Sequence, residues 1–380
     1  MPGWAGSSWY FYRYMDSANK DFFASKEAID YWKSVDIYLG GSEHATGHLL
    51  YSRFYQKFLF DLNILPINEY ASKLINQGMI LGNSSFIYRE RGTNKFYSKD
   101  LIKDKNVDKI RIDISYVDID NYLYVDKLKK SDKSFSDSEF YSENGKFIVE
   151  REHEKMSKSK FNVVNPDDIC DQYGADTLRM YEMFLGPIEQ SKPWSTRGIS
   201  GVHSFLKKFW NLFFLNGNFN VSQDNPSEES IKILNQTIKK VTNDIEKFSL
   251  NTCVSSFMIC INKLSEEKCN NKSVLKQLLI LISPFAPHFA EELWSLMGNK
   301  ESILDEPFPI HDDSVLVESQ KVYPVSFNGK TKFTLSLSLD LSNKEIEEIL
   351  LNDIKTKKYL NNKKPKKVII VKGRIINIVV

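Results

Sequence analysis

The chain has 380 residues, of which 42% are hydrophobic and 26% charged, and its formal net charge is +2. This length suits two or three domains, and the composition excludes a disordered or fibrous protein, while no apolar run reaches the ~20 residues of a membrane span and the first residues lack a signal-peptide pattern. The four cysteines, Cys170, Cys253, Cys260 and Cys269, include no CxxC pair, so we expect reduced thiols in a cytoplasmic protein that has no membrane partner.

The first 82 residues have the pattern of an α/β nucleotide-binding fold. Residues 35–39 predict a short strand, Gly40-Gly41 predicts a turn, and Ser42-Glu43-His44 predicts the start of a helix that runs through Phe54. In such a unit, ligands bind at the carboxyl end of the strand, where helix N–H groups point outward. His44 and His48 lie four residues apart, but no third ligand follows, so no metal site is predicted.

A second apolar run covers residues 74–82, and we expect it to form a strand beside the first. From about residue 83 to residue 150 the pattern is polar, with short alternating pieces at 110–114 and 122–125 that predict a β-rich insertion. Its acids, such as Asp118 and Asp120, are expected to be solvated surface rather than catalytic.

The next segment places three lysines and two serines at residues 155–160, in the sequence KMSKSK. Lysine supplies mobile positive charge and serine supplies small donors, so such a loop can close over a polyphosphate. The alternative is a solvated basic loop, since Lys/Ser runs are common. Asn165 followed by Pro166 predicts a helix start, and Gly174 predicts the end of that helix.

Residues 201–312 are predicted to be helical. Leu234, Ile238, Val241 and Ile245 recur at steps of three and four, which is typical of a helix bundle. A longer apolar element covers residues 275–297, and prolines at its centre predict a kink between two helices. His288, which follows the second proline, is expected to be a satisfied packing residue.

Residues 313–380 predict a small α+β module. Asn328-Gly329 predicts a hairpin turn before an alternating strand at 333–339, and Ser342 with Glu345 predicts a capping box. Two β runs, 368–371 and 375–380, end the chain. Nine Lys/Arg and no acid lie between Lys355 and Arg374. This basic face fits a nucleic-acid backbone, and the alternative is a solvated lysine-rich surface.

Together these segments resemble the C-terminal part of bacterial leucyl-tRNA synthetases, which are class I aminoacyl-tRNA synthetases. The lysine-rich segment alone occurs in many class I synthetases, whereas the other segments narrow the resemblance to the leucine enzymes. The segments that carry the resemblance are GSSWYFYRY, GGSEHATGHLLYSRF, QGMIL, EKMSKSKFNVVNPDDICDQYGADTLRMYEMFLGP, PFAPHFAEELW and the NGK hairpin.

The resemblance implies a multidomain fold. It comprises the C-terminal half of a Rossmann-type catalytic domain with a β-rich insertion, an all-α bundle of the anticodon-binding type, and a small α+β C-terminal domain that contacts tRNA. The expected ranges are 1–82 for the incomplete catalytic domain, 83–150 for the insertion, 151–200 for the KMSKS loop and stem-contact helices, 201–312 for the bundle, and 313–380 for the last domain.

The resemblance also implies a function and its residues. The enzyme would activate leucine with ATP, with Mg²⁺ bound to the substrate phosphates, and transfer it to tRNA(Leu). The leucine pocket would comprise Trp4, Ser7, Tyr10 and His48. ATP would contact Gly40, Gly41, Glu43, His44, Gln77, Gly78, Met79 and Lys158, with Lys155 and Ser157 in support as catalytic residues. The tRNA would contact Lys363, Lys364, Lys366, Lys367, Lys372 and Arg374.

A complete family member has several hundred more residues before the position of Trp4, including the HxGH signature and the editing domain. The run HATGH is not assigned to that signature, because it follows a later strand of the fold. We therefore expect this chain to be inactive without the N-terminal half, which would be its partner if separately encoded. The alternatives are a non-catalytic tRNA-binding subunit or gene remnant, and a related isoleucyl- or valyl-tRNA synthetase.

Overall fold

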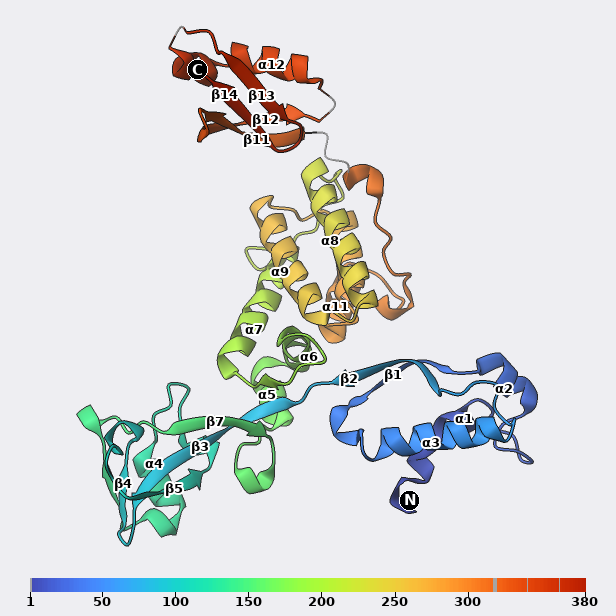
Figure 1. Ribbon diagram of the computed structural model, residues 1–380, viewed down its shortest axis with the longest axis vertical. Coiled ribbons are helices and arrows are strands. Elements are labelled where there is room, and N and C mark those ends of the chain that lie inside the picture. Colours follow the sequence, from blue (N-terminus) through green and yellow to red (C-terminus); the bar gives the residue numbers. More distant parts are fainter. Residues whose placement is uncertain (1, 317–319, 340, 362) are drawn as a thin grey trace. The chain divides into compact units, whose positions relative to one another are not determined.

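The computed structural model describes residues 2–316, 320–339, 341–361 and 363–380. Contacts divide the chain into two compact units, Met1–Ile310 and His311–Val380 (Figure 1). In these described ranges, no helix combines the length and the apolar character that crossing a membrane requires.

The first unit begins with short helices, which a strand–helix–strand arrangement follows. The helices are α1 (Tyr10–Tyr14), α2 (Lys26–Trp32) and α3 (His48–Asp61), and the strands are β1 (Val35–Gly41) and β2 (Ala71–Gln77). The two strands are parallel, with Gly41 opposite Gln77, and α3 runs alongside them (Figure 1). The expected helix start at Ser42 is wrong, because Ser42–His44 forms only a 3-10 turn and Gly47 has non-helical angles of φ −119° and ψ −108°.

A small core holds this region together, and Arg13 organises the loop before α2. The buried core residues are Phe11, Tyr12, Ala24, Ile29, Leu65 and Tyr70. The Arg13 guanidinium donates to five backbone oxygens at 2.6–3.2 Å, those of Asp16, Ser17, Asn19, Phe22 and Phe23. The loop therefore depends on one cation that satisfies carbonyls rather than a carboxylate.

Strand β2 passes directly into a second sheet. The expected strand beside the first is confirmed over residues 74–77, which pair with β1, but the run divides after Gln77, because β3 (Ile80–Glu90) belongs to a six-stranded sheet with different partners. Its other strands are β4 (Lys95–Tyr97), β5 (Val107–Ile112), β6 (Glu139–Tyr141), β7 (Glu150–Lys155) and β8 (Lys192–Pro193), and α4 (Val125–Ser131) lies in the same stretch of chain. Strand β7 pairs antiparallel with β3, with Leu81 opposite Lys155.

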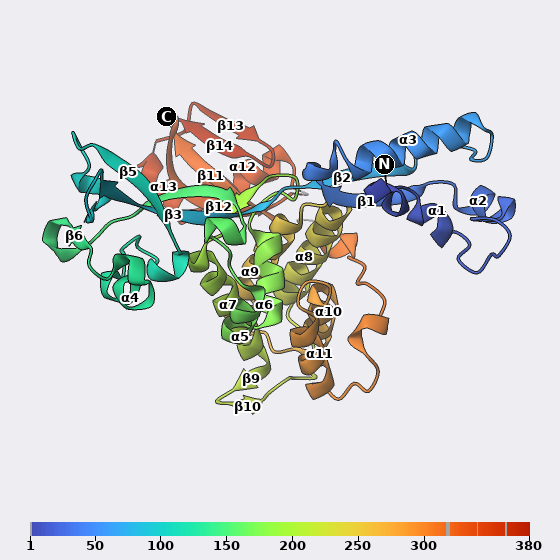
Figure 2. The ribbon, with the colours of Figure 1, turned by 90° about the horizontal axis from the view of Figure 1, so that it is seen from below.

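Helices form the rest of this unit. They are α5 (Pro166–Tyr173), α6 (Ala175–Phe184), α7 (Thr196–Trp210), α8 (Glu228–Glu246), α9 (Leu250–Glu266), α10 (Lys272–Ile282) and α11 (Pro287–Leu296), and Figure 2 shows the short hairpin of β9 (Phe214–Leu215) and β10 (Asn218–Phe219) beyond α7. The predicted cap is confirmed, because the Asn165 side chain accepts from the Asp167 N–H and α5 ends before Gly174. The predicted break at the prolines is confirmed between α10 and α11.

His288 differs from its expected role as a packing residue. Its side chain is 78% exposed, and its Nδ1 lies 2.9 Å from Oδ1 of the nearly buried Asp176. The other oxygen of Asp176 accepts from the Phe289 N–H at 2.6 Å, in the first turn of α11. Asp176 therefore joins α6 to the start of α11, and His288 extends from that joint toward solvent.

The second unit is a mixed four-stranded sheet with two helices. Its elements are β11 (Gln320–Phe327), β12 (Lys330–Ser338), α12 (Asn343–Asn352), α13 (Ile354–Leu360), β13 (Lys367–Val371) and β14 (Ile375–Val379), in strand order β12-β11-β14-β13. The predicted hairpin is confirmed, with φ of 45° at Asn328 and 81° at Gly329. The predicted capping box of Ser342 and Glu345 is confirmed at the start of α12.

Candidate functional site

A cavity of about 270 Å³ lies at the carboxyl ends of the two parallel strands. Its lining residues are Gly41, Glu43, Gln77, Gly78, Met79, Ile80, Lys155 and Met156. One side therefore comes from the ends of β1 and β2, and the other from the end of β7. The fold thus places a polar crevice at the strand ends, where open α/β sheets bind ligands.

Gly41 allows the carboxylate of Glu43 to fold back onto the strand end. A Cβ at Gly41 would lie 2.1 Å from Oε2 of Glu43, so any side chain there would displace this carboxylate. Glu43 lies within the 3-10 turn that follows β1 and lines the cavity. The crevice thus has a carboxylate acceptor beside the end of β1.

Gly78 allows a second close approach, at the passage from β2 to β3. A Cβ at Gly78 would lie 2.1 Å from the backbone carbon of Gln190, which a side chain cannot tolerate. The Gly78 N–H donates to the Ile188 carbonyl at 2.8 Å, and the Met79 carbonyl accepts from the Lys192 N–H at 2.9 Å. The backbone of residues 77–79 is therefore fixed at the wall of the cavity.

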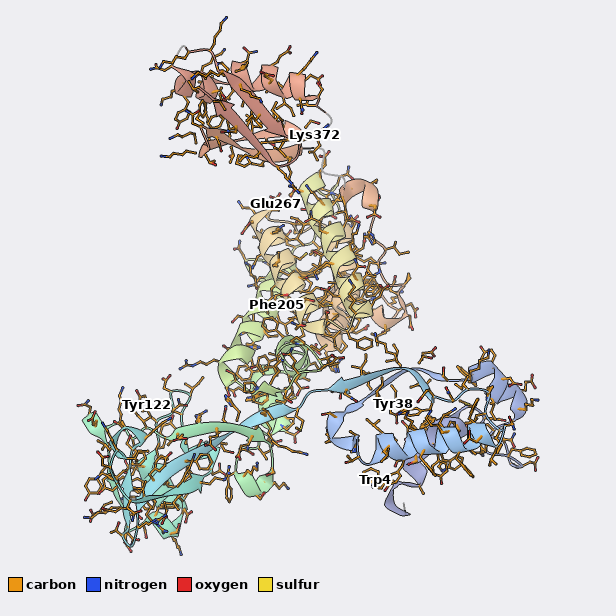
Figure 3. All side chains as sticks on the ribbon, viewed as in Figure 1. Trp4, Tyr38, Tyr122, Phe205, Glu267 and Lys372 are labelled. Carbon is orange, nitrogen blue, oxygen red and sulfur yellow. The ribbon has the colours of Figure 1, made fainter. Side chains whose placement is uncertain are left out.

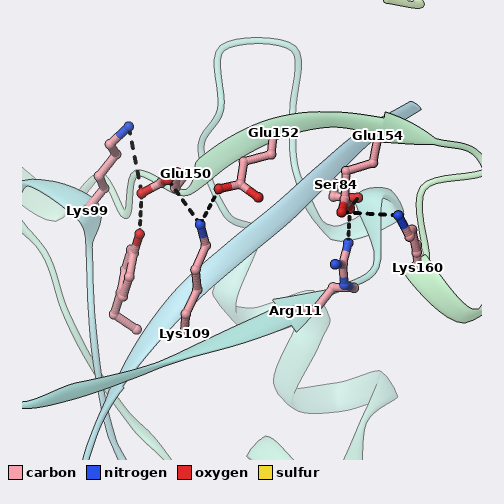
Figure 4. A network of polar contacts seen from close by, with 9 residues as sticks. Ser84, Lys99, Lys109, Arg111, Glu150, Glu152, Glu154 and Lys160 are labelled. Atoms are coloured by element: carbon pink, nitrogen blue, oxygen red, sulfur yellow. Dashed lines mark hydrogen bonds and ion pairs between the residues drawn. The ribbon is translucent and has the colours of Figure 1, made fainter. Parts of the chain in front are cut away.

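We call residues 155–162 the lysine loop, and its three lysines differ in their surroundings. Lys160 lies 3.2 Å from Glu154, whereas the exposed side chains of Lys155 and Lys158 have no carboxylate within ion-pair distance among the residues described. Glu154 also accepts from Arg111 and Ser84 (Figure 4). The hydrogen bond from Arg111, followed by that from Ser84, lowers the pKa of the Glu154 carboxyl to about 2. Lys155 thus brings one ammonium group to the cavity, and Lys158 carries a second in the turn that follows.

The base of the lysine loop is tied to β3 by Asn162, which the sequence interpretation missed. Asn162 is fully buried, and its Oδ1 accepts from the Ser157 N–H at 3.0 Å while its Nδ2 donates to Ser84 Oγ at 3.0 Å. Its one sequence signal is an asparagine between the apolar residues Phe161 and Val163, which does not distinguish it from a surface asparagine.

A second cluster joins the predicted leucine-pocket residues. The ring centroids of Trp4 and His44 are 6.0 Å apart, and those of His44 and His48 are 6.5 Å apart. His48 Nε2 lies 2.6 Å from the Tyr38 hydroxyl, which lies 2.9 Å from the Tyr10 hydroxyl. Figure 3 shows that Trp4 and Tyr38 belong to the α1–α3 part of the chain. Tyr38 completes this cluster and was missed, because residues 35–39 indicated only a short strand.

The electrostatics of this cluster favour neutral side chains. Burial lowers the pKa of His48, and the nearby His44 lowers it further. Burial also raises the pKa of the Tyr38 hydroxyl, and its hydrogen bond with Tyr10 adds to that shift. The Ser7 hydroxyl donates to the Trp4 carbonyl at 3.1 Å. The two shifts favour the uncharged forms of His48 and Tyr38.

Some of the residues predicted to contact ATP line the cavity, and the others lie outside it. Gly41, Glu43, Gln77, Gly78 and Met79 line the cavity. His44 instead contacts Trp4 in the aromatic cluster, Gly40 lies one residue earlier on β1, and Lys158 lies in the exposed turn beyond Lys155 and Met156.

The predicted tRNA-binding cations lie in the second unit, around the edge strand β13. All are exposed: Lys363, Lys364 and Lys366 precede β13, Lys367 begins it, and Lys372 and Arg374 lie in the hairpin that follows. A strand of this length spans about 16 Å, so the cations lie at both of its ends. Such charges also protect an edge strand from pairing with other chains, which is their alternative role.

Comparison with known proteins gives two family matches. Residues 229–370 match the anticodon-binding domain of tRNA ligase, and residues 140–193 match the tRNA synthetases class I (I, L, M and V). The first match covers α8 to α11 and most of the second unit, and the second covers β7, the lysine loop, α5 and α6.

Curated relatives match the chain from end to end. Leucine–tRNA ligases of Christiangramia forsetii and Flavobacterium psychrophilum are 57% and 58% identical to it, over 100% of this chain and 39% and 40% of theirs. A crystal structure titled as the ternary complex of Agrobacterium radiobacter K84 agnB2 LeuRS-tRNA-LeuAMS matches with a TM-score of 0.63 and 26% identity, covering 99% of this chain and 42% of that one. The chain thus spans about two-fifths of the length of its relatives.

Proposed function

Because the chain corresponds along its whole length to the C-terminal part of leucine–tRNA ligases, which are class I aminoacyl-tRNA synthetases, we propose that it forms one side of the site where such an enzyme activates leucine and charges tRNA(Leu). The observation that carries this proposal is the cavity at the ends of β1 and β2, with a lysine loop at its other side. A polyphosphate needs cations without partners, and Lys155 and Lys158 supply them.

The first reaction joins leucine to AMP. A carboxylate oxygen of leucine attacks the α-phosphorus of ATP, the bond from that phosphorus to the bridging oxygen breaks, and pyrophosphate leaves with the electron pair. Lys158 would bind the phosphates, and Lys155 and Ser157 would support it as negative charge shifts to the leaving group. The backbone of residues 77–79 would lie along adenine, and Glu43 would accept from ribose hydroxyls. Catalysis is then mainly orientation and charge stabilisation.

Magnesium would enter as a cation bound to the ATP phosphates, whose charge it would help to neutralise. The side chains along the cavity fit this role better than a resident metal site. Glu43 is the one carboxylate in the lining, and the groups opposite it include the ammonium of Lys155. Hard cations prefer several oxygen ligands, so the phosphates must supply most of them.

The aromatic cluster suits the leucine side chain. Trp4, Tyr10 and His48 would form its walls, with Ser7 at the same end, and the lowered pKa of His48 keeps the imidazole uncharged at neutral pH. An apolar slot of this kind rejects larger side chains sterically, but discriminates weakly against a side chain one methylene smaller.

Helix α3 indicates that this region needs a partner. Leu50, Phe54 and Phe58 lie on one face and are 56%, 62% and 49% exposed, while Ser52 and Gln56 are buried on the other. Parallel strands are normally covered on both faces, yet β1 and β2 form a two-stranded sheet within the described chain. We assign this apolar face to the remaining part of the ligase, since the relatives are about two and a half times longer. The chain alone would then lack part of the ATP site.

The helical bundle and the second unit would hold tRNA(Leu). The match to an anticodon-binding domain over residues 229–370 supports this assignment. Lys363, Lys364, Lys366, Lys367, Lys372 and Arg374 would contact the RNA backbone. Such contacts are electrostatic, so binding would weaken steeply with salt.

Leucine-dependent exchange of pyrophosphate into ATP tests the proposal. The purified chain should show no exchange, whereas the chain co-expressed with the unmatched part of the Flavobacterium psychrophilum ligase should show it. Size-exclusion chromatography establishes that the two parts are bound. Exchange by the chain alone, no exchange by the bound pair, or exchange with isoleucine or valine in place of leucine would each contradict the proposal.

A further inference from the structure

Asn162 makes a complete set of side-chain hydrogen bonds in a fully buried position. Its Oδ1 accepts from the Ser157 N–H at 3.0 Å, and its Nδ2 donates to Ser84 Oγ at 3.0 Å and to the Lys155 carbonyl at 3.4 Å. A primary amide has one acceptor and two N–H donors, and here all three groups have partners. The side chain thus joins the backbone on both sides of Met156 to strand β3.

Strand β3 approaches Asn162 and Met156 closely at Gly82. A Cβ at Gly82 of β3 would lie 2.3 Å from the Asn162 carbonyl oxygen and 2.9 Å from Met156 Cγ. The Met156 side chain packs against the hydrophobic core of the helices. The Phe161 carbonyl accepts from the Ile114 N–H at 3.1 Å. Both ends of the lysine loop are therefore fixed against the sheet.

The tip of the lysine loop has different surroundings. Residues 158–160 form a 3-10 turn, and the side chains of Lys158 and Ser159 are exposed. The hydroxyls of Ser157 and Ser159 are 3.1 Å apart, and Lys160 is bound to Glu154 at the rim. The loop thus has a buried base that holds Lys155 at the cavity and an exposed tip that carries Lys158.

We propose that Asn162 is a positioning residue, which fixes the base of the lysine loop so that Lys155 stays at the cavity and the tip can place Lys158 on the phosphates. The catalytic part of this inference rests on the proposed function of the cavity. Without the amide, the loop would have to be ordered during each reaction, and loss of orientation lowers rate more than it weakens substrate binding. Asn162 itself is buried and does not touch the substrate.

The first test needs no activity. A lysine-specific protease should cleave the Asn162→Ala chain within residues 155–160 at least about tenfold faster than the wild type, because cleavage requires an opened loop. The matched control is Asn165→Ala, which removes the exposed cap of α5 three residues away and leaves the loop bonds intact. Equal cleavage rates in the wild type and Asn162→Ala would overturn the proposal.

The second test uses the assembled ligase. Asn162→Ala should lower kcat for leucine-dependent exchange by about 10- to 100-fold with KM for leucine changed less than threefold, while Asn165→Ala stays close to wild type. Asn162→Asp keeps the acceptor for Ser157 but places a buried carboxylate against the Lys155 carbonyl and Ser84 Oγ, so it should lower kcat at least as far as Asn162→Ala. Equal effects of the two alanine variants would reduce Asn162 to a stability role.

If Asn162→Ala does not fold, Ser84→Ala replaces it, since that change removes one acceptor of the amide, together with the donor to Glu154, and leaves residues 155–162 unchanged. It should speed cleavage of the lysine loop and lower kcat in the same direction, and no change in either would overturn the proposal. If the wild-type pair shows no exchange, the proposed function fails. The cleavage test still decides whether Asn162 fixes the loop.

Discussion

The N-terminal region, residues 2–77, and the helical part of the same unit differ in how completely they bury their apolar residues. The core around the helices contains 35 buried residues, whereas the N-terminal core contains six. The N-terminal region instead exposes Leu50, Phe54 and Phe58 on α3 and keeps polar Ser52 and Gln56 inside. The helices therefore enclose their own core, whereas the region that we propose binds leucine and adenine leaves an apolar face of α3 exposed in the described chain.

The largest effect on stability should come from replacing one phenylalanine in each region by alanine. Phe257→Ala in α9 removes a fully buried ring and should lower the free energy of unfolding by about 3–5 kcal/mol. Phe54→Ala removes a ring that is 62% exposed and should change it by less than about 0.5 kcal/mol. Urea denaturation measures both. Similar losses for the two variants would mean that the face of α3 is covered within this chain.

Lys158→Ala tests whether the site depends on the lysine loop as well as on the N-terminal region. In the assembled ligase it should lower exchange about 100-fold, because a cation for the phosphates is lost, with tRNA affinity within about twofold. Lys160→Ala is the matched control, since Glu154 already pairs with Lys160. It should lower exchange less than about fivefold. A larger loss of exchange activity in Lys160→Ala would mean that Lys160, and not Lys158, binds the phosphates.

Arg13→Met tests how the N-terminal region compensates for its small core. The change keeps an unbranched side chain but removes a donor from five carbonyl oxygens, of which that of Asp16 still accepts from the Asn19 N–H, and it should cost about 1–3 kcal/mol in urea denaturation. Arg91→Met is the control, because Arg91 is exposed and pairs with Asp108 at the surface. It should cost less than about 0.5 kcal/mol. Equal costs would show that water replaces the guanidinium at the five carbonyls.

The smallest effect should be the pH dependence that Glu154 gives to the stability of the fold. The folded-state pKa is about 2, below the ordinary value of 4.5, so the carboxylate stabilises the fold above pH 4.5 and this contribution is lost as the pH falls toward 2. The stability difference between the wild type and Glu154→Gln should therefore shrink over that interval, as followed by urea denaturation from pH 5 to pH 2. If the stability difference stayed constant with pH, it would not come from the charge of Glu154.

Local signals account for what the sequence predicted correctly. The cap at Asn165, the turn at Asn328-Gly329 and the capping box at Ser342 depend on residues within four positions of each other. The strands β1, β12, β13 and β14 follow from alternation or β-branched runs. Residues 41, 43 and 77–79 were expected at the strand ends, and the topology brings them together with Lys155.

The errors have long-range causes. The run at 74–82 includes Asn76 and Gln77 but gives no sign that the chain changes sheets there, and the close approach of Gln190 to Gly78 comes from a distant part of the chain. Asn162 could not be singled out, because its partner Ser84 lies 78 residues away. His288 was expected to be packed, yet its place is set by Asp176, which is 112 residues away.

The backbone of the cavity wall also offers a way to observe the site directly. Three amides hold the crossing from β2 to β3 against residues 188–194, and the bonds run from Gly78 to Ile188 at 2.8 Å, from Lys192 to Met79 at 2.9 Å and from Trp194 to Leu81 at 2.9 Å. Their protons exchange with solvent deuterium only when that crossing opens. A nucleotide that occupied the cavity would hold the crossing closed, so slowed deuterium uptake at these three amides would register its arrival without any turnover.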